Sequence, residues 1–227
     1  MNTVKKYWDK WKHGSWIALY LVFYMMGFFI LENAGNRHYH LIHTVIDDMI
    51  PFCEYFIIPY LLWFPFIGAV ICWFIFFDKN KMEYYQLTCS LAIGMTVFLI
   101  VSCIYPNMQD LRPTVFAHNN IFTQLVHSLY RTDTPTNILP SIHVFNSLAC
   151  FFALNKAGQL QPYRKLRFGA GVLSFLIILA TMFLKQHSVV DVSLGILMAV
   201  TVQAAVEAIF HPQTDTVFSG RPERMTE

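Results

Sequence analysis

Long apolar runs separated by short polar connections dominate the pattern of hydrophobic and polar residues along the chain. A helix needs about 20 mostly apolar residues to cross a membrane, and most of these runs have that length. The runs predict membrane-spanning helices at residues 15–33, 54–77, 85–105, 141–157, 168–185 and 189–210. The pattern therefore predicts an all-α integral membrane bundle of about six transmembrane helices.

The composition agrees with a membrane protein and excludes several other classes. The 227 residues are 56% hydrophobic and 13% charged, whereas soluble domains are about 25% charged. A net charge of +2 without a basic tract argues against a nucleic-acid partner. The five cysteines form no C-x-x-C pair and are expected to be small hydrophobes. His38, His40 and His43 lack the spacing and the Cys or Glu partners of a metal site, so we expect interfacial histidines.

The positively charged residues predict the orientation. If the N-terminus is cytoplasmic, the outer segments hold only four of the 16 lysine and arginine residues: Arg37, Arg112, Arg131 and Lys185. This bias is the one that cytoplasmic loops carry, and an even number of spans then leaves both termini in the cytoplasm. We expect an amphipathic segment at 1–14, a six-helix domain at 15–210 and a cytoplasmic tail at 211–227.

Candidate chemistry lies at the outer ends of the predicted helices. In LKQHSVVDVSLG, His187 and Asp191 are four residues apart, and they share one face if the last helix starts near residue 187. A carboxylate beside an imidazole fixes its tautomer and raises its basicity, which suits a nucleophilic or acid–base histidine. The alternative is a hydrogen-bonded pair that holds two helices together.

Two further motifs fall on the same face. In LPSIHVFNSL, Ser141 is placed as a helix cap and His143 lies in the first turn, where helices bind anions. In NMQDLRPTVF, Arg112 follows the third span, and a guanidinium suits phosphate. Alone, the first motif is more often a plain helix cap with an interfacial histidine, and the second is more often a surface arginine. Together they provide the nucleophile, the acid and the cation that phosphoryl transfer needs.

The order R-P, P-S-x-H and H-x-x-x-D resembles the type 2 phosphatidic acid phosphatase superfamily over about residues 105–195. The resemblance implies a reaction without cofactor or metal, in which His187 attacks phosphorus and becomes a phosphohistidine. It also implies that Asp191 orients His187 and that His143 protonates the leaving alkoxide. Arg112 and Ser141 match phosphate-binding positions of the family.

The chain departs from the common family pattern at three places. Tyr105 stands where a lysine is common, Ile142 replaces the glycine of P-S-G-H, and residues 180–181 are Ala-Thr instead of Ser-Arg. Two expected cations are therefore missing, and Lys185 and Arg131 are the candidate substitutes, with Tyr105 as a hydrogen-bond donor. The pattern is most similar to the branch of inositol-phosphoceramide synthase, whose acceptor is a hydroxyl rather than water.

The expected function is a lipid phosphatase that hydrolyses a phosphomonoester or related lipid phosphate at the outer face of a bacterial-type plasma membrane. Its partners would be the phosphorylated lipid and the surrounding membrane lipids. One alternative is a phosphotransferase that passes the phospho-head group to a lipid or polyol hydroxyl. Another is a catalytically inactive relative that binds lipid, which the missing cations favour and the intact His143, His187 and Asp191 argue against.

Two other polar stretches have less specific interpretations. Asp133 and Asn137, in RTDTPTN, are expected in a turn-rich loop rather than in the lining of a site. Asp47 and Asp48 are expected to shape the substrate entrance or to cap a helix, because their charge would repel phosphate.

Overall fold

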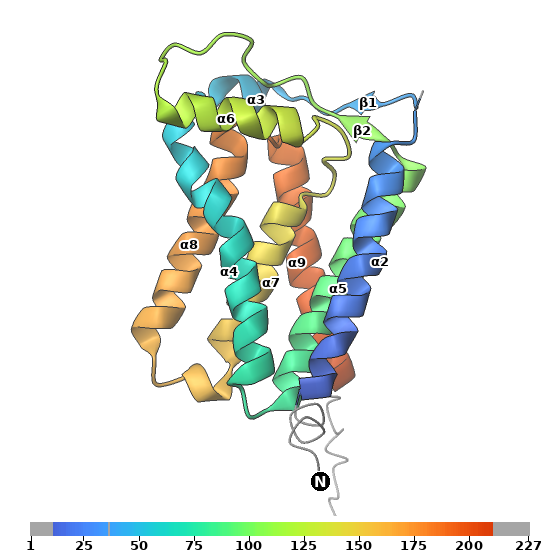
Figure 1. Cartoon of the computed structure of the whole chain (residues 1–227), viewed down its shortest axis with the longest axis vertical. Helices are drawn as coiled ribbons and strands as arrows, with labels where there is room; N and C mark the ends of the chain where they lie inside the picture. The colour runs from blue at the N-terminus through green and yellow to red at the C-terminus, as the bar shows by residue number, and fades with distance from the viewer. Residues whose placement is uncertain (1–10, 36, 211–227) are drawn as a thin grey trace, which may run out of the picture.

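The computed structural model describes residues 11–35 and 37–210 and is an all-α bundle of long apolar helices (Figure 1). Six helices run along the bundle and match the predicted spans to within four residues at each end: α2 (Ser15–Glu32), α4 (Ile57–Phe76), α5 (Lys81–Ile104), α7 (Ile142–Lys156), α8 (Arg164–Phe183) and α9 (Val189–Phe210). Of the predicted N-terminal segment, Lys12–Gly14 form a short 3-10 helix, η1, and residues 1–10 lie outside the described chain. The predicted tail at 211–227 lies outside it as well.

The central helix α7 is shorter than the membrane is thick. Five helices in the described ranges are long and apolar enough to cross a membrane. The 15 residues of α7 extend only about 22 Å, against a hydrocarbon core of about 30 Å. α7 packs against α4, α5, α8 and α9, and its first turn is set back from the end of the bundle (Figure 1). Its N-terminal side chains therefore face the interior.

Helix ends differ from the predicted ones for local reasons. α5 begins at Lys81 because the Asn80 side chain accepts the Met82 N–H and caps the helix. α8 begins at Arg164, so its first turn holds the charged residues that the hydropathy pattern excluded from the span. It ends at Phe183, because Lys185 has a φ of 53°, a left-handed conformation that cannot continue the helix.

Short elements cover one end of the bundle, which we call the capped end. They are α3 (Val45–Met49), the 3-10 helix η2 (Glu54–Phe56), α6 (Ile121–Thr132), and the parallel strands β1 (His40–Leu41) and β2 (Asn107–Met108). α6 was not predicted, although its sequence has apolar residues at helical spacing, including the fully buried Val126. Its start is capped by Asn120, whose side chain accepts two backbone N–H groups.

The opposite end, where α2 begins and α9 ends, carries most of the described positive charge, and we call it the basic end (Figure 1). Its lysines and arginines among the described residues are Lys12, Lys79, Lys81, Lys156, Arg164, Lys165 and Arg167. A further 3-10 helix, η3 (Gly158–Leu160), joins α7 to α8 there. The two ends of the bundle thus differ in both cover and charge.

Close packing of α5 against α7 depends on a glycine. The ring of Phe145 in α7 is fully buried and occupies the space that a Cβ at Gly94 of α5 would need. Helix interfaces in membranes use small residues in this way, because lipid-facing surfaces are as apolar as the helix contacts themselves. Gly94 therefore sets how near α7 lies to α5.

We expect Gly94→Ala to lower the free energy of unfolding by about 1–3 kcal/mol, because the Phe145 ring must leave its place. Gly68→Ala in α4 is the matched control, since a Cβ there meets nothing within 4 Å. Thermal unfolding of both purified variants in detergent measures the difference. Equal melting temperatures would show that Phe145 moves aside at no cost.

Candidate active site

Two histidines and an aspartate form a hydrogen-bonded chain near the capped end. The Nδ1 atom of His187 lies 2.5 Å from Oδ2 of Asp191, and its Nε2 atom lies 3.3 Å from Nδ1 of His143. Asp191 is fully buried and His187 is 7% exposed. An ionised Asp191 accepts the Nδ1–H of His187, so Nε2 carries a lone pair and accepts from Nδ1–H of His143. We call this arrangement the Asp–His–His chain.

Backbone contacts between α7 and α9 hold the two histidines opposite each other. The carbonyl oxygen of Asp191 accepts the N–H of Ser141 at 3.1 Å, two residues before His143. Gly195, one turn further along α9, allows this approach, because a Cβ there would lie 2.8 Å from the Ser141 carbonyl oxygen. On the other side of His187, the carbonyl oxygen of Thr181 accepts the N–H groups of Gln186 and His187.

Two aromatic rings of α4 form a wall behind His143. The ring centroids of Tyr60 and Trp63 lie 4.8 and 4.3 Å from the centroid of His143. The Tyr60 hydroxyl donates to Oδ2 of Asp133 at 3.0 Å, which ties this wall to the 131–137 segment. Both aromatic residues sit inside an apolar run, so no motif in the sequence marks them as part of a site.

A cavity of about 40 Å³ adjoins the Asp–His–His chain. It is lined by Phe28, Phe98, Asp133, Thr134, Thr136, Asn137, Ile138, Ile142, His143, Gln186 and His187. This volume holds only a few water molecules. The prediction that Asp133 and Asn137 belong to a loop outside the site is corrected, because both side chains line this cavity. Burial raises the pKa of Asp133, and the hydrogen bond from Tyr60 opposes that shift.

Glu32, at the end of α2, holds the loop over this cavity. Its carboxylate accepts hydrogen bonds from the side chains of Thr134, Thr136 and Asn137. The cover therefore depends on polar contacts between the end of one helix and a loop about one hundred residues later. No sequence motif marks Glu32, since a single glutamate at a helix end has no distinguishing pattern.

Arg112 reaches the cavity through Gln186. Its terminal nitrogens donate to the carbonyl oxygens of Tyr130, Asp133 and Thr134 and, at 2.5 Å, to Oε1 of Gln186. The guanidinium also lies 4.6 Å from the centroid of the Tyr130 ring. Burial lowers the pKa of Arg112, and the charge of Asp133 opposes that shift. The positive charge is thus next to the cavity, with Gln186 as the side chain that lines it.

The other predicted phosphate ligands make different contacts. Ser141 is fully buried and caps α7, where its hydroxyl oxygen accepts the Val144 N–H at 3.4 Å. The Lys185 ammonium donates to the carbonyl oxygen of Asp47 at 2.6 Å, and burial lowers its pKa. Arg131 is exposed in the last turn of α6, and Tyr105 is 40% exposed with its ring stacked on His40. None of these four side chains lines the cavity as described.

Asp47 of α3 fixes the start of α9 beside His187. Its carboxylate accepts the N–H of Val189 at 2.8 Å and the hydroxyl of Ser188 at 2.7 Å, and it also bonds Thr44. Burial raises the pKa of Asp47, but these hydrogen bonds outweigh burial and the pKa is lowered. Because Lys185 donates to its carbonyl oxygen, Asp47 holds the backbone segments on both sides of His187. The prediction that Asp47 caps a helix is confirmed, and the capped helices are both α3 and α9.

We expect Asp47→Asn to lower the free energy of unfolding by about 1–3 kcal/mol near neutral pH. A carboxylate whose pKa is lowered by folding stabilises the protein above its unfolded pKa of about 3.9 and loses that effect as the pH falls through the folded value. The difference in the free energy of unfolding between Asp47→Asn and wild type should therefore become smaller below about pH 4. Thermal unfolding between pH 3 and 7 measures it. Asp48→Asn is the comparison and should have a smaller effect, since it removes only an exposed pair with His43, of a kind that contributes little to stability.

The remaining outer histidines pair with nearby groups. His43 contacts Asp48 at 2.8 Å and Asp110 at 3.3 Å, and its hydrogen bond with Asp48 raises its pKa. His40 stacks on Tyr105 with ring centroids 4.3 Å apart. Across residues 11–35 and 37–210, no group of three or more His, Cys, Asp or Glu side chains is arranged to hold a metal ion.

A reaction at this site could use three features: the Asp–His–His chain, the adjoining cavity and the charge of Arg112. Comparison with known proteins found no matching family model, no matching curated protein and no matching solved structure.

Proposed function

We propose that the protein is a membrane-embedded lipid phosphatase whose nucleophile is Nε2 of His187. The observation that carries the proposal is the Asp–His–His chain beside a cavity at one end of a membrane bundle. Because Asp191 holds the proton on Nδ1, the lone pair of Nε2 is directed away from Asp191 and toward His143. That lone pair attacks phosphorus, the bond to the lipid oxygen breaks, and a phosphohistidine forms.

His143 supplies the proton that the leaving group needs. Its Nδ1–H points at Nε2 of His187 at 3.3 Å, so a phosphoryl group entering between the rings would have the nucleophile and the acid on opposite sides. After the lipid alcohol leaves with that proton, Nδ1 of His143 accepts a proton from the attacking water. The phosphorus–nitrogen bond then breaks, phosphate is released, and both histidines return to their first state.

The charge of the phosphoryl group would be stabilised by Arg112 and Gln186. Arg112 polarises Gln186 through Oε1, and the Nε2 amide of Gln186 is buried without a hydrogen-bond partner among the described residues. An amide donor of this kind is suited to an anionic oxygen in a site that excludes water. Because the cavity is small, substrate must part the two rings and displace the loop that Glu32 holds.

The charge distribution supports an outward-facing site. Most described lysines and arginines lie at the basic end, and cytoplasmic segments of membrane proteins carry this excess. The capped end, with the Asp–His–His chain, would then face the outside of a plasma membrane. The phosphate of a lipid in the outer leaflet would reach the cavity at the level of its head group.

Arg112 and Lys185 are already hydrogen-bonded within the protein, and this favours one other candidate function, an inactive relative that binds lipid. The terminal nitrogens of Arg112 already donate to four acceptors, and Lys185 is bonded to Asp47. In that case the cavity would hold a lipid head group without reaction. This candidate and the phosphotransferase are separated from the phosphatase by the same experiment.

The test is to incubate the purified protein in detergent with short-chain phosphatidic acid labelled with ³²P. A phosphatase releases phosphate, and a quench during turnover traps an acid-labile, alkali-stable label that is lost in His187→Asn. His38→Asn, an exposed histidine at the same end, should keep both signals. Label that leaves only on addition of glycerol, inositol or a lipid alcohol identifies a phosphotransferase. Absence of label and of product with each acceptor contradicts the proposal and supports the inactive relative.

A further inference from the structure

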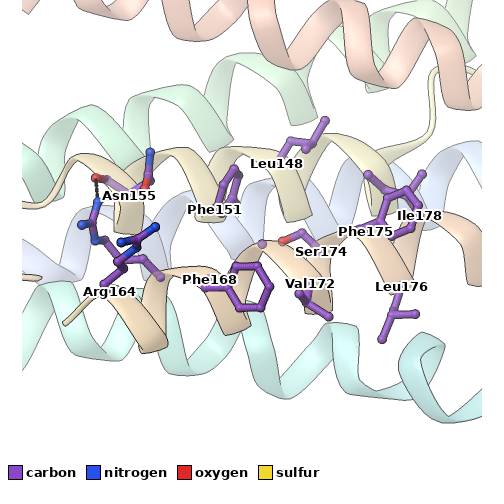
Figure 2. Close-up of a pocket in the computed structure, with 12 residues that line it drawn as sticks. Leu148, Phe151, Asn155, Arg164, Phe168, Val172, Ser174, Phe175, Leu176 and Ile178 are labelled. Carbon is purple, nitrogen blue, oxygen red and sulfur yellow. Dashed lines mark hydrogen bonds between the residues drawn. The ribbon is translucent and has the colours of Figure 1, made fainter. Parts of the chain in front are cut away.

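A long apolar groove runs between α7 and α8, away from the histidines. It has a volume of about 650 Å³. Figure 2 shows Asn155 and Arg164 at one end of this groove and Leu176 and Ile178 at the other. The side chains between them include Phe151 of α7 and Phe168, Val172 and Phe175 of α8. The groove is therefore polar at the basic end of the bundle and apolar along the rest of its length.

The polar end gathers positive charge. Arg164 is exposed, and Arg167 donates to the side-chain oxygen of Asn155 at 3.1 Å and to the carbonyl oxygen of Gln161 at 3.1 Å. A second hollow of about 840 Å³ adjoins it, lined by residues 162–166 and Phe168. The first turn of α8 also lies here, and the partial positive charge of a helix start adds to the arginines. The combined field favours an anion such as a phosphodiester.

Other apolar hollows on the bundle lack this charge. One of about 300 Å³ between α4 and α8 and one of about 510 Å³ on α2 are lined without lysine or arginine. Bulk acyl chains of any lipid can cover such surfaces. The α7–α8 groove differs because it pairs an apolar wall with cations at the level where phospholipid head groups lie.

The dimensions suit one lipid. Arg164 and Ile178 are fourteen residues apart on α8, which corresponds to about 21 Å along the helix. One leaflet contributes about half of the ~30 Å hydrocarbon core, so an acyl chain whose head group lies at Arg164 can follow the groove. Basic pockets between transmembrane helices at the cytoplasmic side bind anionic lipid head groups.

We infer that this groove binds an anionic glycerophospholipid, with the phosphate at Arg164 and Arg167 and one acyl chain along α7 and α8. This lipid is distinct from a substrate at the Asp–His–His chain, because its head group lies at the start of α8, whereas His187 follows the end of α8. Hydrogen bonds connect α8, one wall of the groove, to the part of α7 that carries His143. Ser174 donates to the carbonyl oxygen of Ser147, and Ser147 donates to that of His143. Occupation of the groove therefore stabilises the contact that positions α7.

The test uses delipidated full-length protein in a neutral detergent. Dioleoyl phosphatidylglycerol and dioleoyl phosphatidylcholine are titrated separately, and bound lipid is counted by native mass spectrometry while thermal unfolding is followed. We expect one retained phosphatidylglycerol per chain and a melting temperature several degrees higher, with a much smaller effect of phosphatidylcholine. The Arg164→Gln/Arg167→Gln double variant should bind phosphatidylglycerol roughly 10–30-fold more weakly.

Two variants keep the test decisive. Lys79→Gln/Lys81→Gln removes two exposed positive charges at the same end but outside the groove, and it should bind phosphatidylglycerol as wild type does. If the double variant misfolds, Arg164→Gln alone replaces it, because this single change leaves the Arg167 hydrogen bonds intact. It should still weaken phosphatidylglycerol binding. Equal stabilisation by both lipids, or equal weakening in the Lys79/Lys81 control, would overturn the inference, because either shows attraction to the whole surface.

Discussion

His187→Asn is expected to abolish phosphate release, with a loss in kcat of at least about 10³-fold, while the protein still folds. The asparagine amide can keep the donor that Asp191 accepts, since its nitrogen lies near the place of Nδ1. It has no counterpart of the Nε2 lone pair, so the phosphorus–nitrogen bond cannot form. The measurement is phosphate release from short-chain phosphatidic acid under saturating substrate, alongside a melting curve that shows the variant is folded.

A matched His143→Asn variant separates the nucleophile from the acid. Loss of the acid should slow release of an alkoxide about 10²–10⁴-fold, yet a substrate whose leaving group needs no proton should recover much of that loss. His187→Asn should remain inactive with both substrates. If His187→Asn keeps more than a tenth of the wild-type kcat with normal stability, His187 is not the nucleophile and the phosphohistidine mechanism is wrong.

The fold was predictable where the signal is local. Hydropathy locates the six long helices, because each is a continuous apolar run that needs no knowledge of its neighbours. It misplaces the starts of α5 and α8, whose charged first turns extend from the apolar core toward the basic end. α6 has only 12 residues and one polar face, so hydropathy does not mark it as a span, although its periodicity and Asn120 cap are visible in the sequence.

In the candidate site, too, contacts between residues close in the sequence were predictable, whereas contacts between distant segments were not. The four-residue spacing of His187 and Asp191 predicts their contact, and the structure has it, although His187 lies two residues before the start of α9. The contact with His143 joins two segments far apart in the sequence. The predicted spans place both histidines at the same outer boundary, but they do not predict that the two rings meet. Tyr60 and Trp63 of the aromatic wall have no motif, because their role comes from the packing of α4 on α7.

The direction of the cationic side chains could not be read from the sequence. Lys185 lies two residues before His187, yet its left-handed backbone conformation accompanies a side chain that reaches Asp47 instead of the cavity. Arg112 is near the cavity as its motif suggested, but the carbonyl oxygens that surround it come from a loop about twenty residues away. Loop conformation decides both outcomes, and no short pattern determines it.

Asp191→Asn is expected to lower kcat about 10²–10⁴-fold and to leave KM within roughly threefold of wild type. The fully buried Asp191 does not line the cavity, so its loss should not change how substrate binds. An amide nitrogen in place of Oδ2 can donate to Nδ1 of His187, which moves the imidazole proton to Nε2 and removes the lone pair. In the other amide orientation the tautomer survives, but the negative charge that balances the developing imidazolium is lost.

The split between kcat and KM distinguishes this role from structural support, since a disturbed α7–α9 contact would change substrate binding and stability as well. The kinetic constants for short-chain phosphatidic acid and the melting temperature are measured together. Asp48→Asn is the control, because that carboxylate is exposed and lies outside the Asp–His–His chain. A kcat above one third of the wild-type value would show that Asp191 neither fixes the tautomer nor balances the charge. The carboxylate would then serve only to join His187 to α9, which is the helix-packing alternative that the four-residue spacing had left open.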